Sequence, residues 1–518
     1  MARKNSRKFW FAIMSKRESQ YKPLLLTTTI RNPERLRNFL LVLKAFDGKI
    51  LTNAVCEIVE GELIRRGLYK PTRGITTEIK EKWYNLDLLN DAEVSSLMEL
   101  NPQNHKEAGF DYGWPTRFDT HYKLGMWFGF VYYEIGEKIE FSELGNMYVQ
   151  QTEINDESFF ANDEQQIFLN AFARYHRRNP FQRVLNHNRP LILLLGVLEE
   201  LAKDSDWGSV GLARHELPFL IVWKNNDAKE LANFIVEFRK KWAYTPSSEV
   251  VFDNCEQIQG GWNKAEKMAT ITKELPDEVL RKFRLTGLIS IRGGGRFISL
   301  NSDLKSVADY LLKNYTELKT FATEREYFDY VAVIDPFLIQ EGIAKTQSTS
   351  DGDQAALQSW VEYFGVENIK KELMNLSKGG SSKDDVLRIT PEPLRLEFLS
   401  ALLLKHTYEH SRVVANYKRG DDGLPISHAP GNNADIELYE GSSLHLYEVT
   451  LIKGAAQVKA EMAPITRHQD DYKRGHSDVD TIFVAPNIHI DTVRWVEYWN
   501  DKGFKISNKS IEEFVAAP

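Results

Sequence analysis

Residues 427–468 read SHAPGNNADIELYEGSSLHLYEVTLIKGAAQVKAEMAPITRH, and this stretch decides the fold of the C-terminal part of the chain. Apolar and polar residues alternate over 435–439 and again over 444–452, which predicts two β-strands. Gly441-Ser442 between them suits a two-residue hairpin turn. If the turn is centred between Gly441 and Ser442, the residue numbers of each facing pair add up to 883. Asp435 is therefore predicted to lie opposite Glu448.

Two carboxylates that face each other on a sheet repel, and a divalent cation such as Mg²⁺ would offset the repulsion because it prefers oxygen ligands. The alternative is an exposed face on which both side chains turn to solvent. After the second strand, residues 453–463 predict a helix that ends near Pro464. Its four-residue spacing places Lys453, Gln457 and Glu461 on one side, and brings a third carboxylate near the hairpin.

A buried helix is predicted upstream, beginning at 390–392 and continuing through the apolar segment 394–405. Glu397 is the one acid inside it. Because a buried carboxylate is costly unless it is paired, Glu397 is expected either to form a salt bridge with Arg395 or Arg412 or to bind a cation.

Farther out, two polar segments at 346–353 and 377–385 enclose a helical pattern. They predict a helical linker over 346–385 and a C-terminal α/β domain over 386–518. The region 1–345 is predicted to be mostly helical, with one helix beginning at 32–34. The expected class is a multidomain α+β protein.

A helix over 277–284 followed by strands at 288–291 and 296–300 is the pattern of a winged helix. The glycines at 293–295 form the turn between the strands. They do not form a phosphate-binding loop, because a strand follows them where such a loop requires a helix.

Basic residues gather in three clusters, at 174–189, 239–241 and 281–296, in a chain of net charge −7. Each cluster alone is as well explained by a solvated surface, whereas the three together favour binding to phosphates. The candidate DNA contacts are Arg174, Arg177, Arg178, Arg183, Arg239, Lys240, Lys241, Arg284, Arg292 and Arg296.

The composition excludes several classes of protein. The 518 residues are 42% hydrophobic and 27% charged, within the globular range. The longest strongly apolar run, 191–198, is too short to cross a bilayer. Cys56 and Cys255 are isolated, which excludes a disulfide framework and a cysteine zinc site. We therefore expect a cytoplasmic protein with packed thiols and no membrane contact.

The order of these features resembles a known nuclease core. An acid on a first helix, an Asp at the start of a strand, a Glu on the paired strand and a following helix resemble the PD-(D/E)xK nucleases. More closely, 428–468 resembles the cleavage domain of the type IIS restriction and nicking endonucleases grouped with AlwI. The segments 28–49 (TTIRNPERLRNFLLVLKAFDGK) and 67–71 (GLYKP) are similar to that family's opening.

The resemblance implies a site built from Glu397, Asp435, Glu448 and Glu461, which would bind one or two Mg²⁺ ions. It departs from the nuclease pattern at Thr450, where a lysine is expected. Lys453 or Lys459 would replace that lysine, with Lys453 favoured by its position, or Glu461 would act through a second metal ion. Arg467 and His468 are candidates for contacts with phosphate, and a structural hydrogen bond is an equal alternative for His468.

The resemblance further implies a bacterial, cytoplasmic restriction–modification system with a cognate DNA methyltransferase. Residues 1–345 would read a short asymmetric sequence in double-stranded DNA, and 386–518 would cut outside it. One site cuts one strand, so double-strand cleavage would need a transient homodimer or a second subunit, and a nickase would lack it. A rival interpretation is a DNA-binding regulator with an inactive nuclease domain, which the presence of Thr450 in place of the lysine favours. A nuclease that acts on modified or RNA substrates is a weaker alternative.

Overall fold

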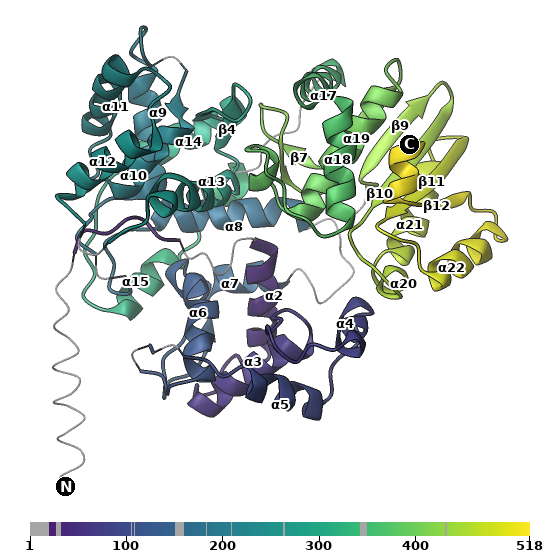
Figure 1. Ribbon diagram of the computed structural model, residues 1–518, viewed down its shortest axis with the longest axis horizontal. Helices are drawn as coiled ribbons and strands as arrows, with labels where there is room; N and C mark the ends of the chain where they lie inside the picture. The colour runs from purple at the N-terminus through teal and green to yellow at the C-terminus, as the bar shows by residue number, and fades with distance from the viewer. Residues whose placement is uncertain are drawn as a thin grey trace. The chain divides into compact units, whose positions relative to one another are not determined.

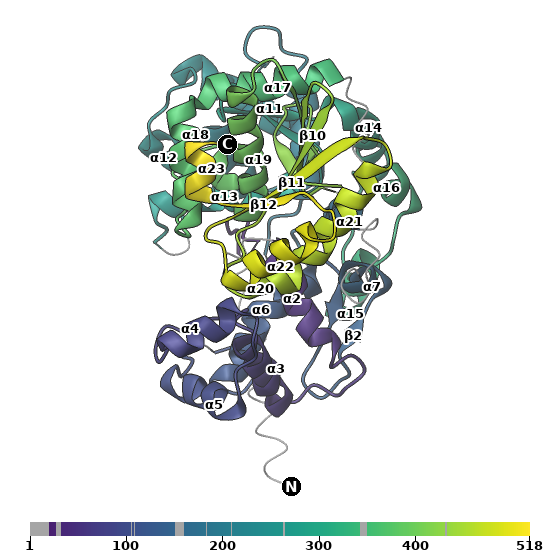
Figure 2. The ribbon, with the colours of Figure 1, turned by 90° about the vertical axis from the view of Figure 1, so that its right-hand side faces the viewer.

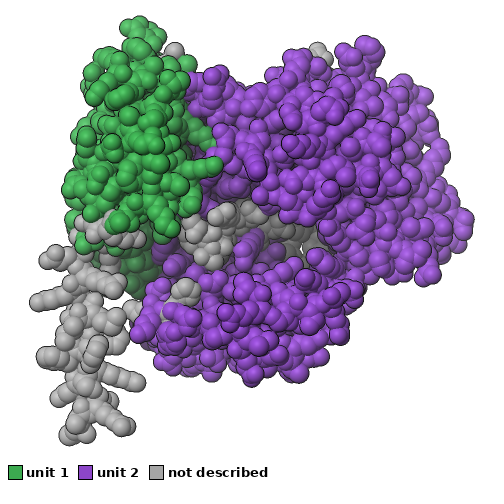
Figure 3. Space-filling view, viewed as in Figure 1, with its two compact units in different colours: residues 1–25, 173–276, 311–327 green, residues 26–172, 277–310, 328–518 purple. Residues whose placement is uncertain are grey.

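The computed structural model describes residues 20–26, 33–104, 106–107, 109–150, 160–182, 184–208, 210–262, 265–341, 350–429 and 433–518. The chain forms two compact units, each assembled from separate stretches of sequence (Figure 3). The first comprises residues 1–25, 173–276 and 311–327, and the second comprises 26–172, 277–310 and 328–518. The functional division at 345 and 385 stays a prediction.

The first unit is built around two apolar helices, α9 (Pro190–Leu201) and α10 (Leu217–Val222). Almost every side chain of α9 is buried. The unit also contains β3 (Leu212–Ala213), α11 (Ala228–Trp242) and α12 (Ser248–Gln259). Cys255 on α12 is buried, as expected for a packed thiol.

The N-terminal part of the second unit is helical. It contains α2 (Pro33–Lys44), α3 (Asn53–Arg65), α4 (Thr77–Tyr84), α5 (Asp91–Leu100), α6 (Trp114–Trp127), β1 (Val131–Tyr132), β2 (Glu140–Phe141) and α7 (Glu143–Gln150). The predicted helix at its start is confirmed as α2, whose residues Leu36, Phe39, Leu40 and Leu43 are buried. Asn32, the predicted helix cap, lies outside the described residues.

Four helices cross a unit boundary in the sequence: α8 (Phe160–Arg174), α13 (Leu275–Arg284), α14 (Lys305–Asn314) and α15 (Glu324–Val331); α16 (Pro336–Glu341) follows within the second unit. After α13 come β4 (Ile289–Arg292) and β5 (Phe297–Leu300), which pair antiparallel, with Ile291 opposite Ile298. The turn glycines 293–295 all have positive φ, a conformation that favours glycine. The predicted helix and hairpin are therefore confirmed, and the assignment as a winged helix stays a prediction.

The predicted linker, 346–385, is helical in its described residues, and its role as a separate segment stays a prediction. Its residues form two helices, α17 (Ser350–Phe364) and α18 (Val366–Ser377), both packed on α19 (Glu392–Thr407). Trp360 stacks on Phe364 and lies edge-on to Phe398 of α19, at a centroid distance of 6.2 Å. The sequence showed a helical pattern here but not the surface on which the helices pack.

The C-terminal domain is a five-stranded mixed sheet in the order β12-β11-β10-β9-β6. The strands are β6 (Arg412–Ala415), β9 (Ile436–Glu440), β10 (Ser443–Val449), β11 (Asp478–Ala485) and β12 (Ile506–Ser510). β10, β11 and β12 are mutually parallel, and β9 runs antiparallel to β10 and β6.

Helices cover both faces of this sheet (Figures 1 and 2). One face carries α18, α19 and α23 (Ile511–Ala516), and the other carries α20 (Ala456–Ala460), α21 (Met462–Lys473) and α22 (Ile490–Asn500). The mixed α+β class expected from the sequence is confirmed. Among the described helices, none is both long and apolar enough to cross a membrane.

Candidate active site

The hairpin register predicted from the sequence is correct. Ser443 pairs with Glu440 and Tyr447 pairs with Ile436, so each facing pair sums to 883. Asp435 lies one residue before β9, and its Oδ2 accepts a hydrogen bond from the backbone N–H of Val449, at 2.8 Å. The Asp435 carboxylate therefore lies against the end of β10, beside Glu448.

Asn416, which follows β6, fixes the backbone around Asp435. Its N–H donates to the Asp435 carbonyl at 2.9 Å, and its side-chain amide donates to the Ala434 carbonyl at 2.8 Å. The same amide donates to Glu437 Oε1 at 2.7 Å. Glu437 is one of the residues that the sequence left unassigned, and it also accepts hydrogen bonds from the hydroxyls of Tyr439 and Tyr472.

Glu448 is buried near the end of β10. Its Oε1 lies 2.8 Å from Nδ1 of His468, which α21 contributes from the face of the sheet that it covers. Of the two roles considered for His468, the structure thus shows a hydrogen bond that orients a carboxylate. A contact of His468 with phosphate stays a prediction.

Glu397 lies in the middle of α19, and its side chain is only 5% exposed. Neither expected arginine pairs with it: Arg395 lies 3.6 Å from Glu392, and Arg412 lies over the ring of Tyr439. Its Oε1 instead contacts Nδ1 of His428. Its Oε2 is buried and has no hydrogen-bond partner among the described residues.

Glu461 lies where the predicted single helix is broken. The chain forms α20 and then α21, and Pro464 lies in the first turn of α21 instead of ending the helix. A proline fits an initial turn as well as a helix end, because neither position needs its missing N–H. The hydroxyl of Thr450 donates a hydrogen bond to the Glu461 carboxylate.

The four carboxylates perturb one another. Burial and the neighbouring charges of Glu397 and Glu448 raise the pKa of Asp435 well above its usual range. Burial also raises the pKa of Glu448, against the opposing effect of His468, and the pKa of Glu461. Raised pKa values of neighbouring acids indicate a site that lacks compensating positive charge.

Neither candidate lysine contacts these carboxylates in the structure. Lys453 precedes α20, so the predicted stacking of Lys453 with Gln457 and Glu461 on one helix is wrong. Its ammonium donates to the carbonyl of Ser377 at 2.9 Å. The ammonium of Lys459 donates to the Asn85 carbonyl and pairs with Asp87, each at 3.0 Å.

The donor chemistry of the four acids suits a hard cation, since carboxylate oxygens are what Mg²⁺ prefers. The buried, unpartnered Oε2 of Glu397 fits the same interpretation. In the part of the chain that the structure describes, no three His, Cys, Asp or Glu side chains are grouped closely enough to hold a metal ion. The acids thus provide suitable donors but not a preassembled ligand cage.

Three predicted DNA contacts are buried, and that assignment of them is wrong. Arg177 donates to the carbonyls of Lys22 and Ile221. Arg239 is fully buried and binds both oxygens of Glu216, at 2.7 and 2.6 Å. Arg284 pairs with Asp422 at 3.0 Å, with a side chain 7% exposed. A buried guanidinium whose N–H groups bind acceptors inside the fold cannot reach a DNA phosphate.

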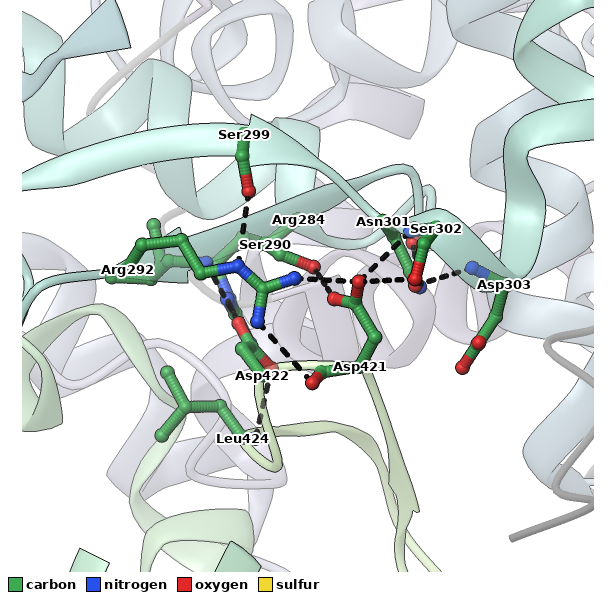
Figure 4. Close-up of polar contacts among 12 residues, drawn as sticks. Arg284, Ser290, Arg292, Ser299, Asn301, Ser302, Asp303, Asp421, Asp422 and Leu424 are labelled. Atoms are coloured by element: carbon green, nitrogen blue, oxygen red, sulfur yellow. Dashed lines mark hydrogen bonds and ion pairs between the residues drawn. The ribbon is translucent and has the colours of Figure 1, made fainter. Parts of the chain in front are cut away.

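The remaining candidates differ in exposure. Arg292 is 41% exposed and pairs with Asp421 at 2.5 Å (Figure 4), and Arg174 is half-buried over the ring of Tyr315. Arg183 lies outside the described residues. Four basic residues are exposed and stay predicted DNA contacts: Arg178, Lys240, Lys241 and Arg296.

His428 and Asn416 are the site residues that the sequence did not reveal. His428 stands in the quoted stretch, seven residues before Asp435, but no spacing connects it to Glu397 on a distant helix. Asn416 lies before the stretch altogether. Only the tertiary fold brings both to the carboxylates.

Comparisons with known proteins identify one family and two solved structures to which the chain is similar. A family model described as AlwI restriction endonuclease matches residues 126–340 and 360–516. The solved small subunit of the heterodimeric restriction endonuclease R.BspD6I is 21% identical over 28% of this chain and 74% of its own, with a TM-score of 0.24. Restriction endonuclease FokI is 13% identical over 94% of both chains, also with a TM-score of 0.24. A comparison with curated proteins gives no match. The second segment of the family match contains all four carboxylates.

Proposed function

The chain belongs to the AlwI restriction endonuclease family and is a site-specific deoxyribonuclease, and from this premise we propose that it is a type IIS enzyme. It reads a short asymmetric sequence in double-stranded DNA with residues 1–345 and cuts outside that sequence with the C-terminal domain. The observation that carries the proposal is the group of carboxylates beside the end of β10, where desolvation and mutual repulsion raise the pKa of Asp435 and Glu448.

Asp435 and Glu448 would hold Mg²⁺, with Glu397 or Glu461 completing the set and a second ion possible in the same group. When bound, Mg²⁺ lowers the pKa of a coordinated water and stabilises charge on the leaving oxygen. The chain's own residues orient the ligands: His468 holds Glu448, and Asn416 and the Val449 N–H hold Asp435.

Glu461 is our candidate for accepting the proton of the attacking water. A carboxylate can act as a general base, burial raises the pKa of Glu461, and the Thr450 hydroxyl contacts its carboxylate. Lys453 is the alternative, although its ammonium is directed to the Ser377 carbonyl. A loss of about a hundredfold in Lys453→Ala, with Lys459→Ala nearly normal, would assign the role to Lys453.

One such site cuts one strand. Cleavage of both strands would therefore need a transient second copy or another subunit, and the protein acting alone would be a strand-specific nickase. The ratio of nicked to linear plasmid at rising protein concentration measures which of these holds.

The test is incubation of supercoiled plasmid with purified protein and Mg²⁺ or EDTA, followed by run-off sequencing of the products. We expect cuts at a constant offset from one short sequence. Asp435→Ala and Glu448→Ala should each abolish cleavage and leave DNA binding in Ca²⁺ nearly intact. Cleavage retained in Asp435→Ala would contradict the assigned site. Specific binding without any cleavage by the wild-type protein would instead establish the inactive regulator.

A further inference from the structure

One hairpin of the C-terminal domain connects two distant features of the second unit. It consists of β7 (Lys418–Arg419) and β8 (Pro425–Ser427), with the turn 420–424 between them. Its tip contacts the β4–β5 hairpin, and the residue that follows β8 is His428, which contacts Glu397.

The tip is held by two aspartates with many partners (Figure 4). Asp421 Oδ2 binds Arg292 at 2.5 Å and the hydroxyl and N–H of Ser302 at 2.6 and 2.9 Å. Asp422 Oδ2 binds Arg284 at 3.0 Å and the N–H of Ile291 at 2.7 Å. These hydrogen bonds and ion pairs therefore fix the position of the tip.

At the base of the hairpin, the two strands pair with each other. Lys418 pairs with Ser427 across the two strands, and both side chains are buried. At the tip, the indole N–H of Trp360 on α17 also donates to the Asp422 carbonyl at 2.8 Å. Because His428 follows Ser427 directly, these contacts determine where its ring lies.

His428 contacts only one of the two carboxylate oxygens of Glu397. Oε1 accepts from His428 Nδ1, whereas Oε2 is buried and without a partner among the described residues. The charge of Glu397 raises the pKa of Asp435, Glu448 and Glu461, which places this carboxylate beside all three. A carboxylate that is held through one oxygen keeps its other oxygen available to a cation. Residues behind metal ligands commonly orient the ligands through such hydrogen bonds.

We propose that His428 is a positioning residue for Glu397, and that the β7–β8 hairpin, anchored by Asp421 and Asp422, sets the place of His428. His428 itself touches neither DNA nor cation. It restricts the rotation of Glu397 so that Oε2 faces the other three acids. This inference rests on the metal-dependent cleavage proposed above.

The decisive measurement is binding of Mn²⁺ to the full-length protein without DNA, followed by electron paramagnetic resonance. We expect His428→Ala to weaken Mn²⁺ binding by about 10- to 100-fold and to raise the Mg²⁺ concentration needed for half-maximal plasmid cleavage similarly. Because saturating Mg²⁺ offsets weaker binding, the maximal cleavage rate should fall less. His428→Asn keeps a donor near the position of Nδ1 and should recover most of the affinity.

A matched control is His445→Ala. His445 is also partly exposed, and its Nδ1 also contacts a carboxylate, that of Asp480, at 2.5 Å. It lies near the start of β10 rather than at the carboxylate site, so His445→Ala should bind Mn²⁺ as the wild type does. Equal thermal unfolding midpoints of the two alanine variants would exclude misfolding as the cause.

A second variant tests the hairpin. Asp421→Asn lies at the far end of the hairpin and should weaken Mn²⁺ binding in the same direction as His428→Ala, to a smaller extent. Normal Mn²⁺ binding in Asp421→Asn would overturn the role of the anchor. Mn²⁺ binding within twofold of wild type in His428→Ala would overturn the whole inference. Two further variants, Glu397→Gln and Asp435→Asn, show whether the proposed metal site itself also fails. If those two variants lose Mn²⁺ binding while His428→Ala does not, the proposed metal site stands and only the role of His428 fails.

Discussion

The carboxylate of Asp435 has a raised pKa in the folded protein, because it is buried beside Glu397 and Glu448. Below about pH 3 an aspartate is largely protonated in both the folded and the unfolded chain, so the raised pKa costs no stability. As the pH rises, the unfolded chain ionises first, and the folded state loses stability until the pH passes the raised pKa. A tenfold difference in acidity between the two states corresponds to about 1.4 kcal/mol of stability.

Asp435→Asn should therefore raise the thermal unfolding midpoint of the metal-free protein at pH 8, and this gain should shrink toward pH 5. The Asn side-chain oxygen still accepts the hydrogen bond of the Val449 N–H. Calorimetry in EDTA at both pH values measures the difference, with the exposed Asp501→Asn as control. A lower midpoint for Asp435→Asn at pH 8 would contradict the electrostatic account.

Arg239 and Lys240 are neighbours in the sequence that should respond to mutation in opposite ways. Arg239→Ala leaves the buried Glu216 unpaired and should lower the free energy of unfolding by about 3–5 kcal/mol. Lys240 is exposed and pairs with Glu237, which is also exposed, so Lys240→Ala should change stability by less than about 0.5 kcal/mol. If Lys240 contacts a phosphate, the slope of log K against log salt concentration for DNA binding should fall by about 1. Denaturation and salt titrations of both variants measure these effects.

The same two residues show what the sequence could predict. Clustering of charge is visible in the sequence, and it singled out both. Burial is not visible, because Glu216 lies 23 residues before Arg239 and is brought to it only by the packing of α11. The Asp435 and Glu448 pair was predictable because both belong to one hairpin, whose register follows from alternation and the turn.

At the scale of elements, the loop from β10 to α20 makes a close approach that only glycine allows. Gly454 has φ +70°, and a Cβ there would lie 2.5 Å from Asn85 Oδ1. Gly441, in the β9–β10 turn, has φ +61° but no atom within 4 Å of an added Cβ. The two glycines share a positive φ, which would strain any residue with a Cβ, and they differ in steric contact.

Gly454→Ala should consequently destabilise the protein more than Gly441→Ala, which carries only a backbone cost of about 1 kcal/mol. Because the Gly454 loop follows Glu448 and Thr450 directly, cleavage should also fall more in Gly454→Ala. Thermal unfolding and plasmid cleavage of both variants test this. Equal effects would mean that the Asn85 contact moves aside without cost.

The break between α20 and α21 and the packing of α17 and α18 were both missed from the sequence for one reason. A local pattern gives the period of a helix but not its neighbours. Pro464 is compatible with a helix end and a helix beginning, and the apolar stripe containing Trp360 is compatible with any apolar surface. Tertiary contacts with α19 and β11 decide both cases.

For the whole molecule, the packing of α17 and α18 on α19 moves the boundary of the smallest stable cleavage fragment. Residues 350–518 retain these helices and should unfold cooperatively, whereas 386–518 expose the apolar surface of α19 and should aggregate or remain partly unfolded. Circular dichroism melts and size-exclusion chromatography of the two fragments distinguish them. A cooperative, monomeric 386–518 would show that the two helices are dispensable.

The β9–β10 hairpin has a consequence for the order of folding. Its strands are adjacent in the chain, and isolated hairpins form within about 1–10 μs. Asp435 and Glu448 therefore approach each other early, before α21 delivers His468 from 20 residues farther along the chain. The repulsion between the two acids therefore arises before His468 can offset it, so refolding in EDTA should be slower at pH 8 than at pH 5. The acids that we propose for cleavage would thus also influence how fast this domain folds.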